Sequence, residues 1–243
     1  MYLEQERAEY ERQQQRVIEL INQHGAVDGL LLWKKDPINI GDGIPLRGAD
    51  LSEVDLSYAD LSGADLAGAN LKKAKAVRTR FVGAVLDKAD MYGLVAPAAD
   101  FTAARMNSAK IYCANLTCAI LDSVIARHTR FWETKLPYAR CENARLVFAD
   151  FLSADCEDTL FRGADLRLAK FQNGFLQGAS LQNADMRGTI FSDAFGRKGI
   201  QTAIQILHKA GTLKGAKTKM VKLAQAFPTM VHLASRGSLP LDT

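Results

Sequence analysis

Large apolar residues recur at every fifth position of the chain from Leu46 to Phe191, and no insertion breaks the spacing. The stretch "LRGADLSEVDLSYADLSGADLAGANL", residues 46–71, shows this period with Leu alone. An α-helix would place apolar residues about every 3.6 positions and a strand every second position. A fixed period of five, sustained over this length, therefore predicts a repeat architecture.

A second period accompanies the first. Two residues before each large apolar residue stands a small one, most often Ala, with Thr at five of these positions. Five of the large positions carry small uncharged residues instead, namely Ala76, Ala96, Ala126, Cys141 and Cys156. The alternation of small and large residues predicts that both kinds point inward and fill a narrow interior without voids.

The pattern A-[D/N]-L-x-x over residues 46–191 resembles that of the pentapeptide-repeat proteins. The resemblance implies an all-β solenoid, a right-handed quadrilateral β-helix in which five residues form one side and twenty residues form one coil. Residues 46–191 would then make about seven coils, a rod of roughly 35 Å at about 4.8 Å per coil.

The Phe residues of the repeat support four sides. The seven Phe at large positions are separated by multiples of ten residues: Phe81, Phe101, Phe131, Phe151, Phe161, Phe171 and Phe191. On a four-sided coil this spacing places them on two opposite faces, whereas a three-sided coil would scatter them over all faces. Four of them, from Phe131 to Phe191 in steps of twenty, would stack directly above one another.

The two ends of the chain lack the period of five. Residues 3–24 are expected to form a helix with Leu3, Tyr10, Val17 and Ile21 along one side and Gly25 as its stop. After Phe191 the apolar spacing becomes helical in two segments. The open ends of a solenoid need covering. We therefore expect three parts: an N-terminal helical cap and lead-in (1–45), the β-helix (46–191) and a basic C-terminal helical cap (192–243).

Charge is divided unevenly among these parts. The net charge is −3 for residues 1–45, +1 for residues 46–191 and +6 for residues 192–243. The first coil is locally acidic and the second is basic. No apolar run approaches the ~18 residues that span a bilayer, and the charged N-terminus lacks the apolar segment of a signal peptide. We expect a cytoplasmic bacterial protein.

Candidate catalytic chemistry is sparse. Ten Asp directly precede large positions, and we interpret their carboxylates as hydrogen-bond acceptors for turn backbone. The four His are isolated and show no metal-ligand or triad spacing. The repeat glycines occupy a single repeat position that is typical of turns, not a nucleotide-binding loop. Cys141 and Cys156 are expected in the core, with Cys113 and Cys118 outward. We expect no enzyme, no cofactor and no metal.

A surface row carries the candidate binding site. The positions directly after the large residues, compared at a spacing of twenty, include Tyr92, Tyr112, Trp132 and Leu152, with Lys110 and Arg130 beside them. Exposed aromatic residues next to Arg are typical of protein-binding hot spots. Two structural alternatives stay open: a terminal segment covers this row, or the row stabilises the rod through cross-strand pairs.

Three functional hypotheses follow. The first is a scaffold that binds a protein partner along the rod, with no direct binding of nucleic acid. The resemblance implies the second, because some bacterial family members mimic duplex DNA and bind DNA gyrase, which protects against quinolones or toxins. Such mimicry needs a strongly negative rod, and this one is +1. The third is a membrane-associated bacterial effector anchored by its basic C-terminal helices. A homodimer also remains open.

Overall fold

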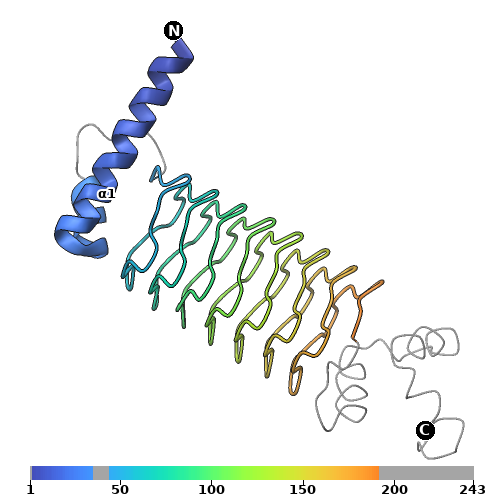
Figure 1. The fold of residues 1–243 in the computed structure, drawn as a ribbon. Coiled ribbons are helices and arrows are strands. Elements are labelled where there is room, and N and C mark those ends of the chain that lie inside the picture. The colour runs from blue at the N-terminus through green and yellow to red at the C-terminus, as the bar shows by residue number, and fades with distance from the viewer. Residues whose placement is uncertain (1, 35–43, 192–243) are drawn as a thin grey trace, which may run out of the picture.

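The computed structural model describes residues 2–34 and 44–191, and the repeat residues wind into a stack of coils (Figure 1). Each β-bridge is parallel and joins residue i to residue i+20, from Pro45 with Asp65 to Lys170 with Ile190. Successive bridges lie five residues apart, so every coil has four sides. The coil of twenty residues and its square section are as the sequence predicts.

Recurring backbone hydrogen bonds hold each coil to the next. Leu51 donates to the Asn70 carbonyl oxygen of the next coil (2.8 Å), and Asn70 donates back to Ala49 (2.9 Å). The same pair of bonds recurs along the described ladder. The rod is therefore stabilised along its axis by regular parallel pairing, although each side contributes only one bridged residue.

A tight turn forms every corner. Ala49 donates to the carbonyl oxygen of Leu46 (3.0 Å), and Gly48 between them has a φ of 67°. A positive φ at the third residue with this hydrogen bond defines a type II turn. The eight repeat glycines all have positive φ, which confirms their prediction as turn residues. Many other corners place a non-glycine residue there, with φ between 53° and 64°.

The interior is filled by the two inward positions. The Ala column and the large apolar column are almost completely buried, and Cys141 and Cys156 are buried among them. Phe131, Phe151 and Phe171 stack with ring centroids 4.7 and 4.6 Å apart, and Phe191 follows at 5.4 Å. Phe81 and Phe101 stack in the same way at 4.8 Å. The Phe ladders are confirmed.

The five Thr of the small column have a role that the sequence does not reveal. Each is buried, and each hydroxyl donates to a carbonyl oxygen of the coil below, 23 residues earlier. Thr129, for example, donates to Met106 over 2.6 Å. A buried hydroxyl without a hydrogen-bond partner would destabilise the fold. Each of these carbonyl oxygens has two lone pairs and can accept from the Thr hydroxyl as well as from a backbone amide, so Thr is tolerated at positions where Ala is usual.

The helix α1 (Tyr2–Lys34) precedes the rod. Gly25 interrupts it with φ 76° and ψ 166°, so the predicted stop is confirmed. Helix then resumes up to Lys34, where the sequence predicted only a lead-in, and the chain turns back on itself (Figure 1). Gly29 explains this turn: a Cβ there would lie 2.5 Å from the Leu20 carbonyl oxygen, so only glycine permits this approach.

Side chains of α1 meet the first coil. Tyr10 accepts a hydrogen bond from the Arg47 amide (3.1 Å), and Gln14 donates to the Arg47 carbonyl oxygen (2.6 Å). Ala67 is the equivalent of Arg47 one coil later, and its carbonyl oxygen accepts a hydrogen bond from the backbone amide of Gly48 (2.9 Å). The side-chain amide of Gln14 therefore replaces the backbone donor that a preceding coil would supply. Val17, Leu20 and Ile21 are buried in the same apolar cluster as Ile44 and Leu46. The predicted C-terminal cap lies outside the described residues.

Candidate interaction surfaces

The predicted row of Tyr92, Tyr112, Trp132 and Leu152, here called the aromatic stripe, follows one corner of the rod. Tyr92 is 44% exposed, and the other three are half-buried. The rings of Tyr112 and Trp132 stack at 5.0 Å with an angle of 28° between their planes. The stripe is thus present as a row, but its central side chains lie along the surface and do not project from it.

The two predicted cations beside the stripe behave differently. Arg130 donates to the Tyr112 hydroxyl (3.1 Å), and its guanidinium carbon lies 5.9 Å from the centre of the Trp132 ring, within the range of a cation–π contact. Lys110 is directed to Asp90, with Nζ 3.8 Å from a carboxylate oxygen. Arg130 therefore belongs to the stripe, whereas Lys110 is held by an ion pair at its edge.

Two structural alternatives for the stripe were cover by a terminal segment and stabilisation of the rod through cross-strand pairs, and the contacts bear on both. The hydrogen bonds that Tyr10 and Gln14 of α1 make with the rod are at Arg47, in the first coil. The stacking of Tyr112 on Trp132 is the cross-strand pairing that stabilises neighbouring coils. The stripe as a partner-binding site stays a prediction.

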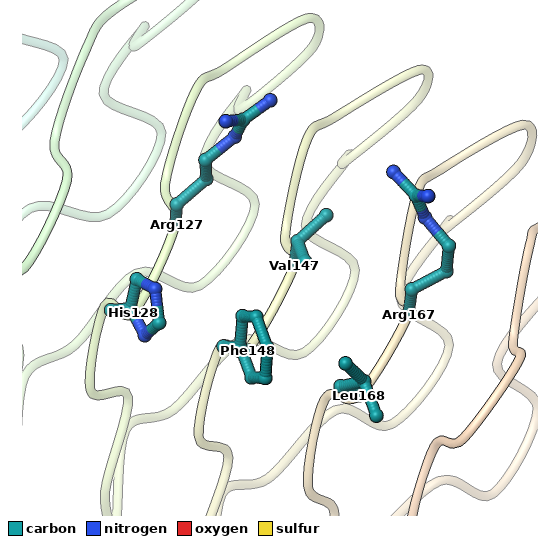
Figure 2. Close-up of a pocket in the computed structure, with 6 residues that line it drawn as sticks. All are labelled: Arg127, His128, Val147, Phe148, Arg167 and Leu168. Atoms are coloured by element: carbon teal, nitrogen blue, oxygen red, sulfur yellow. The ribbon is translucent and has the colours of Figure 1, made fainter.

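A second surface lies on the next corner and was missed in the sequence. Arg127, Val147 and Arg167 form one row, and His128, Phe148 and Leu168 form the row beside it (Figure 2). Together they line a shallow groove of about 300 Å³, here called the arginine groove. The row of His128 contains turn glycines in other coils, which concealed its apolar members. Reading that row at a spacing of twenty would have found them.

Ion pairs between coils account for the charge pattern of the first two coils. Arg80 lies 3.7 Å from Asp60 and Lys73 lies 3.7 Å from Glu53, each joining the basic coil to the acidic one. Exposed pairs of this kind contribute about 0–1 kcal/mol each. Their larger effect is electrostatic, because Glu53, Asp60 and Asp65 each have a cation within 4 Å. Hydrogen bonds from Ser52 and Ser57 lower the pKa of Asp50 and Asp55, and Lys72 and Lys75 lower it in part.

The ten Asp before large positions have the structural role predicted for them. Each carboxylate accepts a hydrogen bond from the backbone amide two residues later, at 2.9–3.3 Å. The Ser52 hydroxyl, more than its amide, lowers the pKa of Asp50, and the Arg167 guanidinium lowers that of Asp165. Within residues 2–34 and 44–191, no group of three or more His, Cys, Asp or Glu could hold a metal ion.

The four cysteines are free thiols. Cys141 and Cys156 are fully buried, and desolvation raises the pKa of both thiols far above the usual range. Thiols in that state are poor nucleophiles. Cys113 and Cys118 are exposed, as predicted. Cysteine chemistry therefore adds nothing to the candidate surfaces.

A parallel β-helix with five-residue sides and a filled interior is a solenoid repeat protein, which presents surface and not a cleft. A family model described as pentapeptide repeats matches eight copies, within residues 46–72, 64–94, 149–188 and 164–195. The chain belongs to the pentapeptide-repeat family, whose members fold as right-handed quadrilateral β-helices. Proteins of this family are generally non-enzymatic.

Solved structures of the same family resemble the chain. A trypsin-treated variant of QnrB1, a plasmid-mediated fluoroquinolone resistance protein, aligns with a TM-score of 0.52 at 19% identity, over 67% of this chain and 84% of QnrB1. Rfr23 from the cyanobacterium Cyanothece is 29% identical over 35% of this chain and 58% of its own, with a TM-score of 0.35. HetL, a pentapeptide-repeat protein from Nostoc that is involved in the regulation of heterocyst differentiation, is 23% identical over 71% of this chain and 95% of its own, with a TM-score of 0.22.

The other comparisons add little. No curated protein matches the sequence. In the part of the chain that the structure describes, no helix is both long and apolar enough to cross a membrane.

Proposed function

We propose that this protein is a non-enzymatic interaction scaffold of the bacterial cytoplasm, which presents its rod to a protein partner. The observation that carries the proposal is the aromatic stripe, where stacked Tyr112 and Trp132 lie beside the Arg130 guanidinium on the outer surface. Aromatic residues and Arg dominate binding energy at protein interfaces. The filled interior and the structural role of the ten Asp leave the surface as the part available for function.

We also propose that residues 46–191 form one continuous rod. It would have about seven coils, from the twenty-residue period over residues 46–191. The contacts of Tyr10 and Gln14 with Arg47 support α1 as the cap of its first coil. Residues 192–243 would cap the other end or pair two copies of the chain.

Modulation of DNA gyrase is a second candidate function, because QnrB1 is a fluoroquinolone resistance protein and shares the fold. The charge of the rod weighs against it, since residues 46–191 carry +1 and Glu53, Asp60 and Asp65 of the first coil are in ion pairs. A DNA gyrase supercoiling assay in the presence of a quinolone separates the two functions. If this protein protected gyrase from the quinolone, the result would favour modulation of gyrase. Attachment to membranes through residues 192–243 is tested by flotation with anionic liposomes.

The stripe is tested by capture of partners from bacterial extract with the full chain. Trp132→Ala should reduce the yield of a specific captured protein at least tenfold, since a central interface aromatic is worth about 2 kcal/mol or more. Tyr138→Ala is the control, because Tyr138 is 60% exposed on a different corner. Equal capture by both variants would remove the stripe from the proposal.

A further inference from the structure

The arginine groove has an apolar row that is unusually exposed for this rod. Phe148 is 47% exposed and Leu168 is 45% exposed. The His128 ring stacks on Phe148 with centroids 4.7 Å apart and planes 8° apart. A Cβ on Gly188 would lie 2.6 Å from a Leu168 methyl group, so the missing side chain at Gly188 leaves room for Leu168. The row is continuous over three coils.

The other lining of the groove is positively charged. Within the described residues, the guanidinium group of Arg127 has no carboxylate partner, although most other Arg of the rod do. Arg167 is different, because it makes two hydrogen bonds to Asp165, at 2.8 and 2.7 Å. The groove therefore pairs an apolar row with one cation, Arg127, whose charge no carboxylate neutralises, which complements an apolar ligand that also carries a carboxylate.

The spacing of the row selects the shape of the ligand. Neighbouring members lie about one coil apart, 4.7 Å for His128 and Phe148. One turn of an α-helix rises 5.4 Å, so a helix parallel to the rod axis drifts by only about 1.4 Å over two coil steps. Alternate residues of a strand repeat every ~6.7 Å and drift by about 4 Å over the same length. A helix can therefore contact all three coils with one side chain per turn.

We infer that the arginine groove binds an amphipathic helix of a partner protein, with one apolar side chain per turn on the row from His128 to Leu168 and a carboxylate facing Arg127. The inference rests on the proposed scaffold function and gives the chemistry of one partner segment. The groove lies on the corner next to the aromatic stripe, and the side between them carries Arg130. One partner could thus contact both surfaces.

The test uses the full chain and three labelled synthetic peptides in fluorescence anisotropy. The first is an 18-residue helical peptide with Leu once per turn and Glu on both flanks, the second has Lys in place of each Glu, and the third alternates Leu and Glu. We expect the acidic helical peptide to bind at least tenfold more tightly than the other two. Phe148→Ser and Arg127→Glu should each weaken it at least tenfold.

Matched variants control for folding. Tyr138 has the same turn position and the same φ of 59° as Phe148, so Tyr138→Ser should leave binding unchanged. Arg162→Glu is the corresponding charge reversal on another corner. Equal binding of the Lys peptide, tighter binding of the alternating peptide, or no loss in Phe148→Ser would overturn the inference. So would self-association of the chain in sedimentation that Phe148→Ser abolishes, since a second copy would then occupy the groove.

Absence of binding by all three peptides up to about 1 mM would also overturn the inference, since even a weak specific contact of about 4 kcal/mol gives this affinity. That result would leave the capture experiment with Trp132→Ala unaffected. Failure of the groove and failure of the scaffold proposal are thereby distinguishable.

Discussion

Phe161 meets Phe151 edge to face across the interior of the rod, with ring centroids 5.8 Å apart and planes at 82°. The two residues belong to opposite faces of the coil, so this contact joins the ladder of Phe131, Phe151, Phe171 and Phe191 to a Phe of the facing side. Phe171 and Phe161 meet in the same way, with ring centroids 5.7 Å apart. The square section is therefore filled by interlocking aromatic rings at this level, a favourable geometry for aromatic pairs.

Phe151→Ala should lower the free energy of unfolding by about 3–5 kcal/mol, because it removes the ring that stacks on both neighbours of its ladder and leaves a cavity. Thermal melting of the purified variant measures the loss. Gln172→Ala, a surface change in the same region, is the control. A melting temperature no lower than that of the control would show that Phe151 is not part of a packed interior.

Ala103 and Ala104 are neighbours that should respond oppositely to glycine. Ala103 has a φ of 56°, where a side chain costs about 1–2 kcal/mol, so Ala103→Gly relieves strain that exceeds the added flexibility of the unfolded chain. We expect a gain of up to about 1 kcal/mol in stability. Ala104 is fully buried, and Ala104→Gly should destabilise by about 1 kcal/mol or more. Denaturant titration compares them, and a loss of stability in Ala103→Gly would contradict the turn assignment.

The edge of the first coil provides a local test. Tyr10→Phe removes the hydroxyl that accepts from the Arg47 amide, leaving that amide to exchange with water. Hydrogen exchange at Arg47 should become at least tenfold faster, while amides in later coils, such as Leu116, keep their rates. Unchanged exchange at Arg47 would mean that α1 does not cover this end of the rod in solution.

Asp165 should contribute to stability in a pH-dependent way. Its hydrogen bonds to Arg167 hold the pKa of its carboxyl below the usual value, which is about 3.9 in an unfolded chain. When folding lowers the pKa of a carboxyl group, the ionised group stabilises the folded state at pH values above the pKa of the unfolded chain. This stabilisation is lost as the pH falls through the pKa of the folded state. Because the pair is near the surface, the contribution is under about 1 kcal/mol.

The measurement is the melting temperature from pH 7 to pH 2 for the wild type and Asp165→Asn. The variant should melt lower at pH 7, and the difference should shrink as pH falls below about 4. A difference that grows toward low pH would reverse the sign and contradict the assignment of the Arg167 hydrogen bonds.

The inward half of the rod was predictable, because its chemistry repeats. The period of five dictates which residues are buried, and the phase of the Phe residues dictates the square, as the stack of Phe131 on Phe151 shows. The glycines and aspartates of the turns follow from backbone geometry that is the same at every corner. These features depend only on the position of a residue within its repeat.

The outward half was less predictable. Whether a side chain such as Trp132 or Phe148 projects or lies flat depends on its neighbours one coil above and below, and these follow no period. The return of α1 after Gly25 depends on the close approach of Gly29 to Leu20, a tertiary contact that no local pattern encodes. The predicted stripe was thus found as a row, while the groove beside it was missed.

The central claim, that the aromatic stripe contacts a protein partner, is tested most directly by site-specific photo-crosslinking in bacterial cells. A photoreactive phenylalanine analogue is placed at Tyr92, 44% exposed on the stripe, or at Tyr58, 65% exposed on another corner. We expect a discrete crosslinked product from position 92 alone, and its loss when Trp132→Ala is added. The same product from both positions, or its persistence with Trp132→Ala, would contradict the account.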